Sequence, residues 1–260
     1  MKGELGFGIA AGARPGTERL GPAIERLGYA ELWANDTRRG AALDTLAAAA
    51  GGTSALRFGV GVIGLSEHAP ERILAALDGA VDAGLDPNRV TLGVGSGASR
   101  SLDLVRDGVA ELRRLLPDQH IAVAALGPRM CTLAGEIADT VLLNWALPET
   151  LVRRRAWVTS GAARAGRRPP RVTAYVRVAV GGGAAERLRG EMERYAGQSG
   201  AYGRLFAEQA GPVGVAVDDP AQLRSALLPY RSVLDCCVVR ALPDGDGIDD
   251  WLAVAEAATC

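Results

Sequence analysis

The chain has 260 residues, of which 48% are hydrophobic and 23% charged, so it holds enough apolar material for a folded core. Its formal net charge of −1 gives no bulk electrostatic reason to bind nucleic acid or an anionic membrane. No run in the sequence approaches the roughly 18 uninterrupted apolar residues that span a bilayer, and Glu4 interrupts the first apolar run, which is typical of a strand rather than a signal peptide. We therefore expect a cytoplasmic protein that acts on a small molecule.

The cysteines and histidines do not predict a metal site. None of the four cysteines belongs to a CxxC pair, and only two histidines accompany them. Cys236 and Cys237 are adjacent in a strand-like run, so their side chains should point to opposite faces of a sheet. We expect unpaired thiols, as in a reducing cytoplasm.

Strands and helices are predicted in strict alternation along the chain. Eight short apolar runs predict strands at 4–10, 30–34, 57–63, 89–94, 120–125, 140–144, 171–180 and 233–240. Amphipathic segments predict helices at 17–27, 41–51, 70–83, 102–116, 128–137, 148–165, 184–209, 220–228 and 247–258.

This alternation favours one closed barrel. Each strand–helix pair takes about 30 residues, the size of a βαβ unit, and near-continuous apolar strands are typical of a parallel sheet covered by helices. A doubly wound open sheet would share the pattern, but eight units without a linker favour an α/β fold of the (β/α)8 TIM-barrel type over residues 1–260 as a single domain. Functional residues of such barrels collect at the C-terminal ends of the strands.

Glycine-rich segments follow three of these strands. In LGPRM (126–130), Gly127 permits close backbone approach, Pro128 suits the first helical position, and the N–H groups that follow can bind an anion, with Arg129 adding charge. GVGSG (93–97) is a second such corner, though it matches a dinucleotide fingerprint only in part. GVGVIG (59–64) places glycines inside a strand, which indicates a bulge, contact with a ligand, or tight packing against a helix.

Five segments, in chain order, resemble the luciferase-like flavin and deazaflavin oxidoreductases. They are ERLGYAELWANDT (25–37), GVGVIGLSEHAP (59–70), RVTLGVGSG (89–97), AALGPRMCTLAGEIADTVLLNW (124–145) and LDCCVVRALP (234–243). The fourth is the most specific and GVGSG the least. The likeness is greatest to the branch that depends on coenzyme F420 and includes methylenetetrahydromethanopterin reductase. The long insertions of the family are trimmed, notably after Ser96, so we expect short insertions and an open mouth.

The resemblance implies a barrel, usually dimeric, that holds coenzyme F420 or FMN with its ring at the C-terminal mouth. It also implies a non-proline cis peptide in a bulge of the third strand that supports the ring, which in this sequence would be Gly61–Val62. Phosphate-binding positions and contacts to the cofactor tail map to the ends of the fourth, fifth and sixth strands. The cofactor-binding residues carried over are Gly61, Val62, Ile63, Gly95, Ser96, Gly97, Ala125, Leu126, Gly127, Asn144 and Trp145.

Asp36 matches the acidic residue that follows the second strand in the family, in a motif that commonly reads Trp-x-x-Asp-His. Thr37 stands where the His is usual, which puts a His-assisted mechanism at that corner in doubt. Trp33 lies within the strand, so a core position is favoured over stacking on the cofactor ring.

Three further residues are candidates for contact with substrate. Glu67 and His68 follow the bulged strand and could donate protons or bind substrate, although a histidine in a loop often has no such role. Arg240 ends the eighth strand and could bind an anionic group of the substrate or the cofactor; a structural ion pair is the alternative.

The implied activity is hydride transfer between the deazaflavin C5 and a small molecule, such as reduction of a C=C or C=N bond, possible in specialised metabolism, or oxidation of an alcohol. Asp36 is the first candidate for proton transfer, because a carboxyl in a partly apolar mouth can have a raised pKa. Two alternatives remain: an FMN-dependent luciferase-like monooxygenase, and a non-catalytic barrel that binds a flavin or deazaflavin. The sequence does not identify the substrate.

Overall fold

A computed structural model describes residues 3–12, 14–37, 40–198 and 200–260. It contains the strands β1 (Glu4–Ala10), β2 (Glu31–Asn35), β3 (Arg57–Val60), β4 (Ile63–Gly64), β5 (Val90–Gly95), β6 (His120–Ala125), β7 (Thr140–Asn144), β8 (Arg171–Val180), β9 (Val215–Val217) and β10 (Cys236–Ala241). Its α-helices are α1 (Leu20–Arg26), α2 (Ala42–Ala50), α3 (Pro70–Asp82), α4 (Leu102–Leu115), α5 (Pro128–Ile137), α6 (Pro148–Arg164), α7 (Ala184–Gln198), α8 (Gly200–Ala207), α9 (Leu223–Ala226), α10 (Leu228–Val233) and α11 (Ile248–Thr259).

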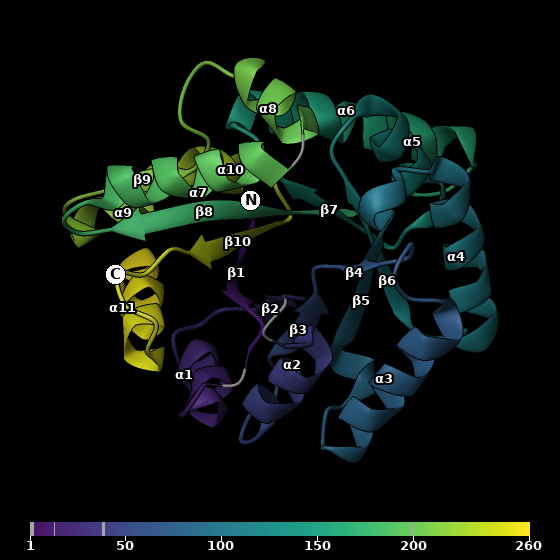
Figure 1. The fold of residues 1–260 in the computed structure, drawn as a ribbon, viewed down its shortest axis with the longest axis horizontal. Helices are drawn as coiled ribbons and strands as arrows, with labels where there is room; N and C mark the ends of the chain where they lie inside the picture. Colours follow the sequence, from purple (N-terminus) through teal and green to yellow (C-terminus); the bar gives the residue numbers. More distant parts are fainter. Residues whose placement is uncertain (1–2, 13, 38–39, 199) are drawn as a thin grey trace.

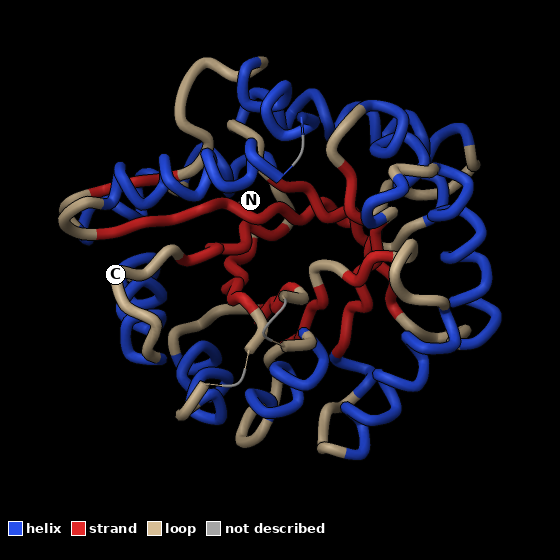
Figure 2. The backbone as a smooth tube through the Cα atoms, in the orientation of Figure 1, coloured by secondary structure: helices blue, strands red, loops and turns tan. Residues whose placement is uncertain are grey.

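The strands form a closed parallel barrel. Neighbouring strands run in the order β10–β1–β2–β3–β5–β6–β7–β8, and the parallel pairing of β8 with β10 closes the ring. Figure 2 shows the strands as an inner ring and the helices as an outer one, and Figure 1 gives their order. The predicted TIM barrel is thereby confirmed, and the doubly wound open sheet is excluded. None of the described helices is long and apolar enough to cross a membrane.

Among the strands, the structure differs from the sequence prediction mainly in three places. The predicted third strand is interrupted at residues 61–62, and only its two ends, β3 and β4, pair with β5. The last strand starts at Cys236 rather than at 233, because 228–233 form the helix α10. The short strand β9 was not predicted. Three apolar residues between a Gly-Pro and an Asp-Pro segment are too few to show a period, and β9 forms because the end of β8 offers a pairing edge.

Side chains alternate between the interior of the barrel and the layer under the helices. Trp33, Leu142, Tyr175 and Val238 form a cluster inside the barrel, whereas the residues next to them in sequence pack outward against the helices. Trp33 is 1% exposed and donates its indole N–H to Glu31, so its predicted core position is confirmed. Cys236 and Cys237 belong to the inner and outer clusters respectively, as their adjacency predicts.

Charged residues close the N-terminal end of the barrel. The guanidinium of Arg57 lies 2.6 Å from the Glu4 carboxylate and 3.0 Å from that of Glu31. Arg171 lies 2.9 Å from Glu31, whose side chain is 8% exposed. Each charge here has an opposite charge beside it, so this end of the barrel is electrostatically balanced.

Acid should weaken this network. Burial alone would raise the pKa of Glu4, but the hydrogen bonds and charges of Arg171 and Arg57 outweigh it and lower the pKa below its ordinary value of 4.5. The stabilisation is therefore complete above pH 4.5 and is lost as pH falls through the lowered folded value. Since Glu4 is half exposed, we expect Glu4→Gln to lower the thermal midpoint by less than about 4 °C at neutral pH, with a difference that shrinks as the pH falls below 4.5.

Thermal unfolding followed by circular dichroism over this pH range measures the effect. Asp78→Asn, which changes an exposed carboxylate on α3, serves as the control and should leave the midpoint unchanged. A Glu4→Gln difference that is the same at both ends of the pH range would show that Glu4 does not act through its charge.

Candidate active site at the C-terminal ends of the strands

The C-terminal end of the barrel is open to solvent. Inward-facing residues at the strand ends are small or polar and partly exposed; they include Ala10, Asn35, Gly61, Ala124 and Asn144. The outward-facing residues that precede or follow them are buried. The outer side of the strands is therefore covered, while their inner side at this end is accessible. (β/α)8 barrels place their active sites at this C-terminal end.

The Gly61–Val62 peptide bond is cis and lies between β3 and β4, where the resemblance placed it. Gly61 donates its N–H to the carbonyl of Ala34 at 2.8 Å. A Cβ atom at Gly61 would collide with the hydroxyl of Tyr175 and would lie 2.8 Å from a methyl group of Leu142. Glycine is therefore required here because two side chains inside the barrel pack directly against its Cα.

The corner formed by Gly95–Gly97 is already occupied by a carboxylate. Glu67 accepts hydrogen bonds from the Ser66 hydroxyl at 2.6 Å and from the Ala98 N–H at 3.2 Å. A Cβ at Gly97, whose φ is +60°, would collide with the Glu67 carboxylate. An N–H group that the sequence analysis offered to a phosphate is thus bound by Glu67, and a negative charge stands beside it.

The same hydrogen bonds affect whether Glu67 can act as a proton donor. The hydrogen bond from the Ser66 hydroxyl is the main cause that lowers the pKa of Glu67, and the Ala98 N–H acts in the same direction. Glu67 is therefore a carboxylate at neutral pH and is poorly suited to donate a proton. The side chain of the adjacent His68 is exposed, and its backbone N–H bonds the Gly64 carbonyl at 3.0 Å.

The second glycine corner has space around it. Gly127 is the N-cap of α5, with no side chain to cap the helix, and Pro128 is the first helical residue. No atom lies within 4 Å of a Cβ added at Gly127, and Gly127 and Arg129 are exposed. Of the two predicted corners, this one leaves its helix N-terminus accessible to an anion.

Three of the predicted cofactor contacts do not face the mouth. Ala125 and Ile63 point outward into the core beneath the helices, and Ala124 occupies the inward position instead. Trp145 is 1% exposed, with φ +51°, and packs against Tyr195 of α7 and Phe206 of α8. Strand alternation and the α7–α8 layer turn these three side chains away from the mouth, so their role in cofactor binding stays a prediction that rests on their backbone atoms.

Asp36 follows β2 at the mouth and is partly buried. Its Oδ1 accepts the Ala42 N–H at 2.7 Å, at the first residue of α2, so the carboxylate caps that helix. An amide oxygen could replace this contact, which allows the capping role of Asp36 to be separated experimentally from its acidity.

Arg240 lies in the wall of the barrel beside a second arginine that the sequence analysis did not single out. Arg177 on β8 is its direct partner in the strand register, and the two side chains are 3% (Arg177) and 7% (Arg240) exposed. No ion pair involves either one in the described part of the chain, so a structural ion pair of Arg240 is not found. Sequence reasoning could have identified Arg177 from its position two residues after Tyr175 in the mostly apolar strand β8.

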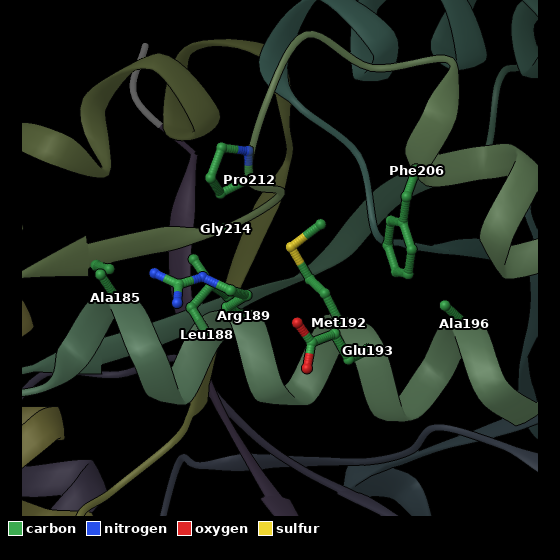
Figure 3. A pocket seen from close by; sticks show the side chains of 10 residues that line it. Ala185, Leu188, Arg189, Met192, Glu193, Ala196, Phe206, Pro212 and Gly214 are labelled. Atoms are coloured by element: carbon green, nitrogen blue, oxygen red, sulfur yellow. The ribbon is translucent and has the colours of Figure 1, made fainter.

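A cavity of about 750 Å³ lies between α7, α8 and β9, away from the predicted residues. Figure 3 shows the side chains of Met192 on α7 and Phe206 on α8 pointing into this space, which Pro212 and Gly214 also border. None of the predicted site residues lines this apolar space. The chemistry-bearing groups therefore remain those at the strand ends.

The fold and this mouth define a (β/α)8 barrel with its candidate active site at the C-terminal ends of the strands. The sequence model of the family described as Luciferase-like monooxygenase matches residues 109–226. The 5,10-methylenetetrahydromethanopterin reductase of Methanolobus tindarius is 36% identical over 70 residues, 27% of this chain, and the match spans only 22% of the length of that relative. The predicted luciferase-like resemblance is confirmed.

Solved structures are similar over the whole chain. An F420-dependent secondary alcohol dehydrogenase in complex with an F420-acetone adduct has a TM-score of 0.76 at 14% identity, covering 99% of both chains. The coenzyme F420 dependent tetrahydromethanopterin reductase of Methanopyrus kandleri scores 0.69 at 17% identity, with 99% of this chain and 98% of that one covered. The oxygenating constituent of 3,6-diketocamphane monooxygenase of Pseudomonas putida, in complex with FMN, scores 0.65 at 16% identity, with 100% and 97% covered. These likenesses concern the fold.

Proposed function

We propose that this protein is a coenzyme F420-dependent oxidoreductase that transfers a hydride between the deazaflavin and a small-molecule substrate at the barrel mouth. The observation that carries the proposal is the mouth itself, where Gly61 packs against Tyr175 and Leu142 among small, partly exposed residues, at the place where the resembling family rests its cofactor ring. Both the resembling branch and two of the similar structures are F420-dependent.

The residues present fit such a cofactor. The Gly61–Val62 backbone would support the middle of the ring, and the exposed N-terminus of α5, with Gly127 and Arg129, would hold the phosphate of the tail. The Glu67 carboxylate disfavours a phosphate at the neighbouring Gly95–Gly97 corner. When bound, the deazaflavin would supply the hydride chemistry.

Asp36 is the residue that we propose to hold and transfer the proton. It lies at the end of β2, next to the partly exposed Asn35 in the mouth, and its position is fixed by the hydrogen bond from Ala42. A positioned carboxyl group contributes about 100-fold or more to a reaction that needs proton transfer. His68 remains a reserve donor because its side chain is exposed near the mouth.

Titration of the purified protein with coenzyme F420 and separately with FMN, followed by fluorescence, tests the proposal. We expect saturable F420 binding that is tighter than FMN binding. Gly127→Val should weaken F420 binding by about tenfold, because the new side chain fills the approach to α5. Gly51→Val is the matched control, since Gly51 also has no atom within 4 Å of an added Cβ and lies at the opposite end of the barrel.

The second candidate is an FMN-dependent monooxygenase, which the similarity to the FMN-bound Pseudomonas putida structure supports. Reduced FMN reacts with oxygen, whereas a reduced deazaflavin does so poorly. Preference for FMN together with oxygen consumption during turnover would overturn the F420 proposal in favour of the monooxygenase. Tight binding without turnover of any acceptor would identify a cofactor-binding barrel without catalytic activity.

A further inference from the structure

Two arginines face each other across adjacent strands inside the mouth. Arg177 on β8 and Arg240 on β10 are direct register partners. Each lies two residues after a member of the inner cluster, Tyr175 and Val238 respectively, so both side chains point to the interior side of the barrel. Like charges that are directly opposite on neighbouring strands destabilise a sheet.

Within the described residues neither guanidinium forms an ion pair with a carboxylate, and Glu191 acts on Arg240 only through its charge. Arg177 donates to the side-chain oxygen of Asn144 and, at 3.0 Å, to the hydroxyl of Tyr195, while Arg240 donates to the Ala241 carbonyl at 3.2 Å. All these acceptors are uncharged, and no carboxylate of the described chain forms an ion pair with either arginine. At the other end of the barrel, by contrast, Arg57 and Arg171 share Glu4 and Glu31.

Donors in this wall also lack partners. The Nε atoms of Arg177 and Arg240 and the hydroxyl of Tyr175 are buried without a hydrogen bond. Burial, reinforced by the charge of Arg177, lowers the pKa of Arg240 to about 10, which leaves Arg240 charged at neutral pH. Buried charges and donors without partners are costly, and native proteins retain them mainly where a ligand satisfies them.

The wall lies close to the proposed ring position. The Tyr175 hydroxyl sits directly against Gly61, and the guanidinium of Arg177 lies 5.8 Å from the centre of the Tyr175 ring. Trp145 packs on the other side of Arg177, 4.2 Å from its guanidinium, and holds that side chain in place. Guanidinium groups are suited to carboxylate and phosphate groups, which accept several hydrogen bonds at once.

We propose that Arg177, Arg240 and Tyr175 bind a carboxylate or phosphate group of the substrate, so that the molecule oxidised or reduced at the mouth is an organic anion. The reaction of this substrate rests on the proposed function, whereas the binding of an anion at these residues does not depend on it. The substrate would place its charged group against the β8–β10 wall and its reacting carbon toward Gly61.

Isothermal titration of the cofactor-free protein with inorganic phosphate, at constant ionic strength, tests the site. We expect saturable binding that Arg240→Gln weakens by about tenfold or more. Arg240→Gln should also unfold at the same or a higher temperature than the parent in phosphate-free buffer, because it removes one of two facing charges. Arg155→Gln is the control: Arg155 pairs with Asp235 outside the mouth, and its loss should leave phosphate affinity unchanged.

Two results would overturn the site. One is phosphate binding that is equal in Arg240→Gln and the parent. The other is a large fall in the unfolding temperature of Arg240→Gln without phosphate, which would give Arg240 a structural role. Tyr175→Phe, which keeps the ring and removes only the hydroxyl, provides a second variant and should weaken phosphate binding without loss of the fold.

Repeating the titration with F420 bound separates the two possible sources of the anion. Arg240-dependent phosphate binding that persists in the loaded protein supports a substrate site, and loss of this Arg240-dependent binding on loading with F420 overturns it in favour of the cofactor tail. If the protein does not bind F420 but still binds phosphate in an Arg240-dependent way, the proposed function is wrong and the anion site stands. If the protein binds F420 but shows no Arg240-dependent phosphate binding, only the anion site is wrong.

Discussion

Gly61→Ala is expected to lose cofactor binding at concentrations that saturate the parent protein. The added methyl group would collide with the Tyr175 hydroxyl and press on Leu142, both buried inside the barrel. Such overpacking destabilises by about 1–3 kcal/mol, and the backbone that we propose as the ring support would shift with it. Fluorescence titration with F420 and chemical unfolding of the same preparation measure the two effects.

The control for Gly61→Ala is Gly79→Ala. Gly79 is in the interior of α3, and a Cβ there meets no atom within 4 Å. Alanine is favoured over glycine inside a helix by about 0.5–1 kcal/mol, so this variant should be slightly stabilised and should bind F420 as the parent does. Unchanged F420 affinity in Gly61→Ala would show that the ring does not rest on residues 61–62.

Asp36→Asn should reduce turnover by about 100-fold or more while F420 binding and stability stay close to those of the parent. The asparagine side chain retains an oxygen that can accept the Ala42 N–H, so the cap on α2 survives although the acid is gone. Single-turnover rates with F420 and an accepted substrate measure the loss.

Asp36→Ala completes the comparison because it removes both the acid and the cap. We expect the same loss of turnover as in Asp36→Asn, together with destabilisation of about 1 kcal/mol from the lost cap. Full activity in Asp36→Asn with loss of activity only in Asp36→Ala would show that Asp36 is a structural residue and would direct attention to His68.

The barrel could be predicted because its strands are buried on both faces. Apolar runs such as His120–Ala125 and Thr140–Asn144 have the same bounds in sequence and structure, since turns and helix starts confine them on both sides. The interruption of the third strand was also accessible, through its glycines and the family resemblance. The start of the last strand was not, because Val233 and Leu234 continue the apolar run of the strand in the sequence, whereas Val233 ends the helix α10 in the structure.

The site was predicted less completely than the fold. Proximity to a strand end identifies a residue but does not say to which face its side chain turns. For this reason the outward-turned side chains of Ala125 and Trp145 could not be predicted. The hydrogen bonds from Ser66 and Ala98 to Glu67 depend on two loops that meet only in the folded chain. Arg177 escaped notice because an arginine within a mostly apolar strand acquires its meaning only from the register that places Arg240 beside it.

The electrostatic contrast between the two ends of the barrel has a consequence for how this protein can change. At the N-terminal end, where Glu4 and Glu31 neutralise Arg57 and Arg171, a single substitution leaves a charge unmatched and tends to lower stability. At the mouth, exchange of Arg177 or Arg240 relieves repulsion. Under selection for thermostability alone, we therefore expect these mouth arginines to be replaced first. Retention of both arginines under such selection would indicate that binding of their ligand is also selected.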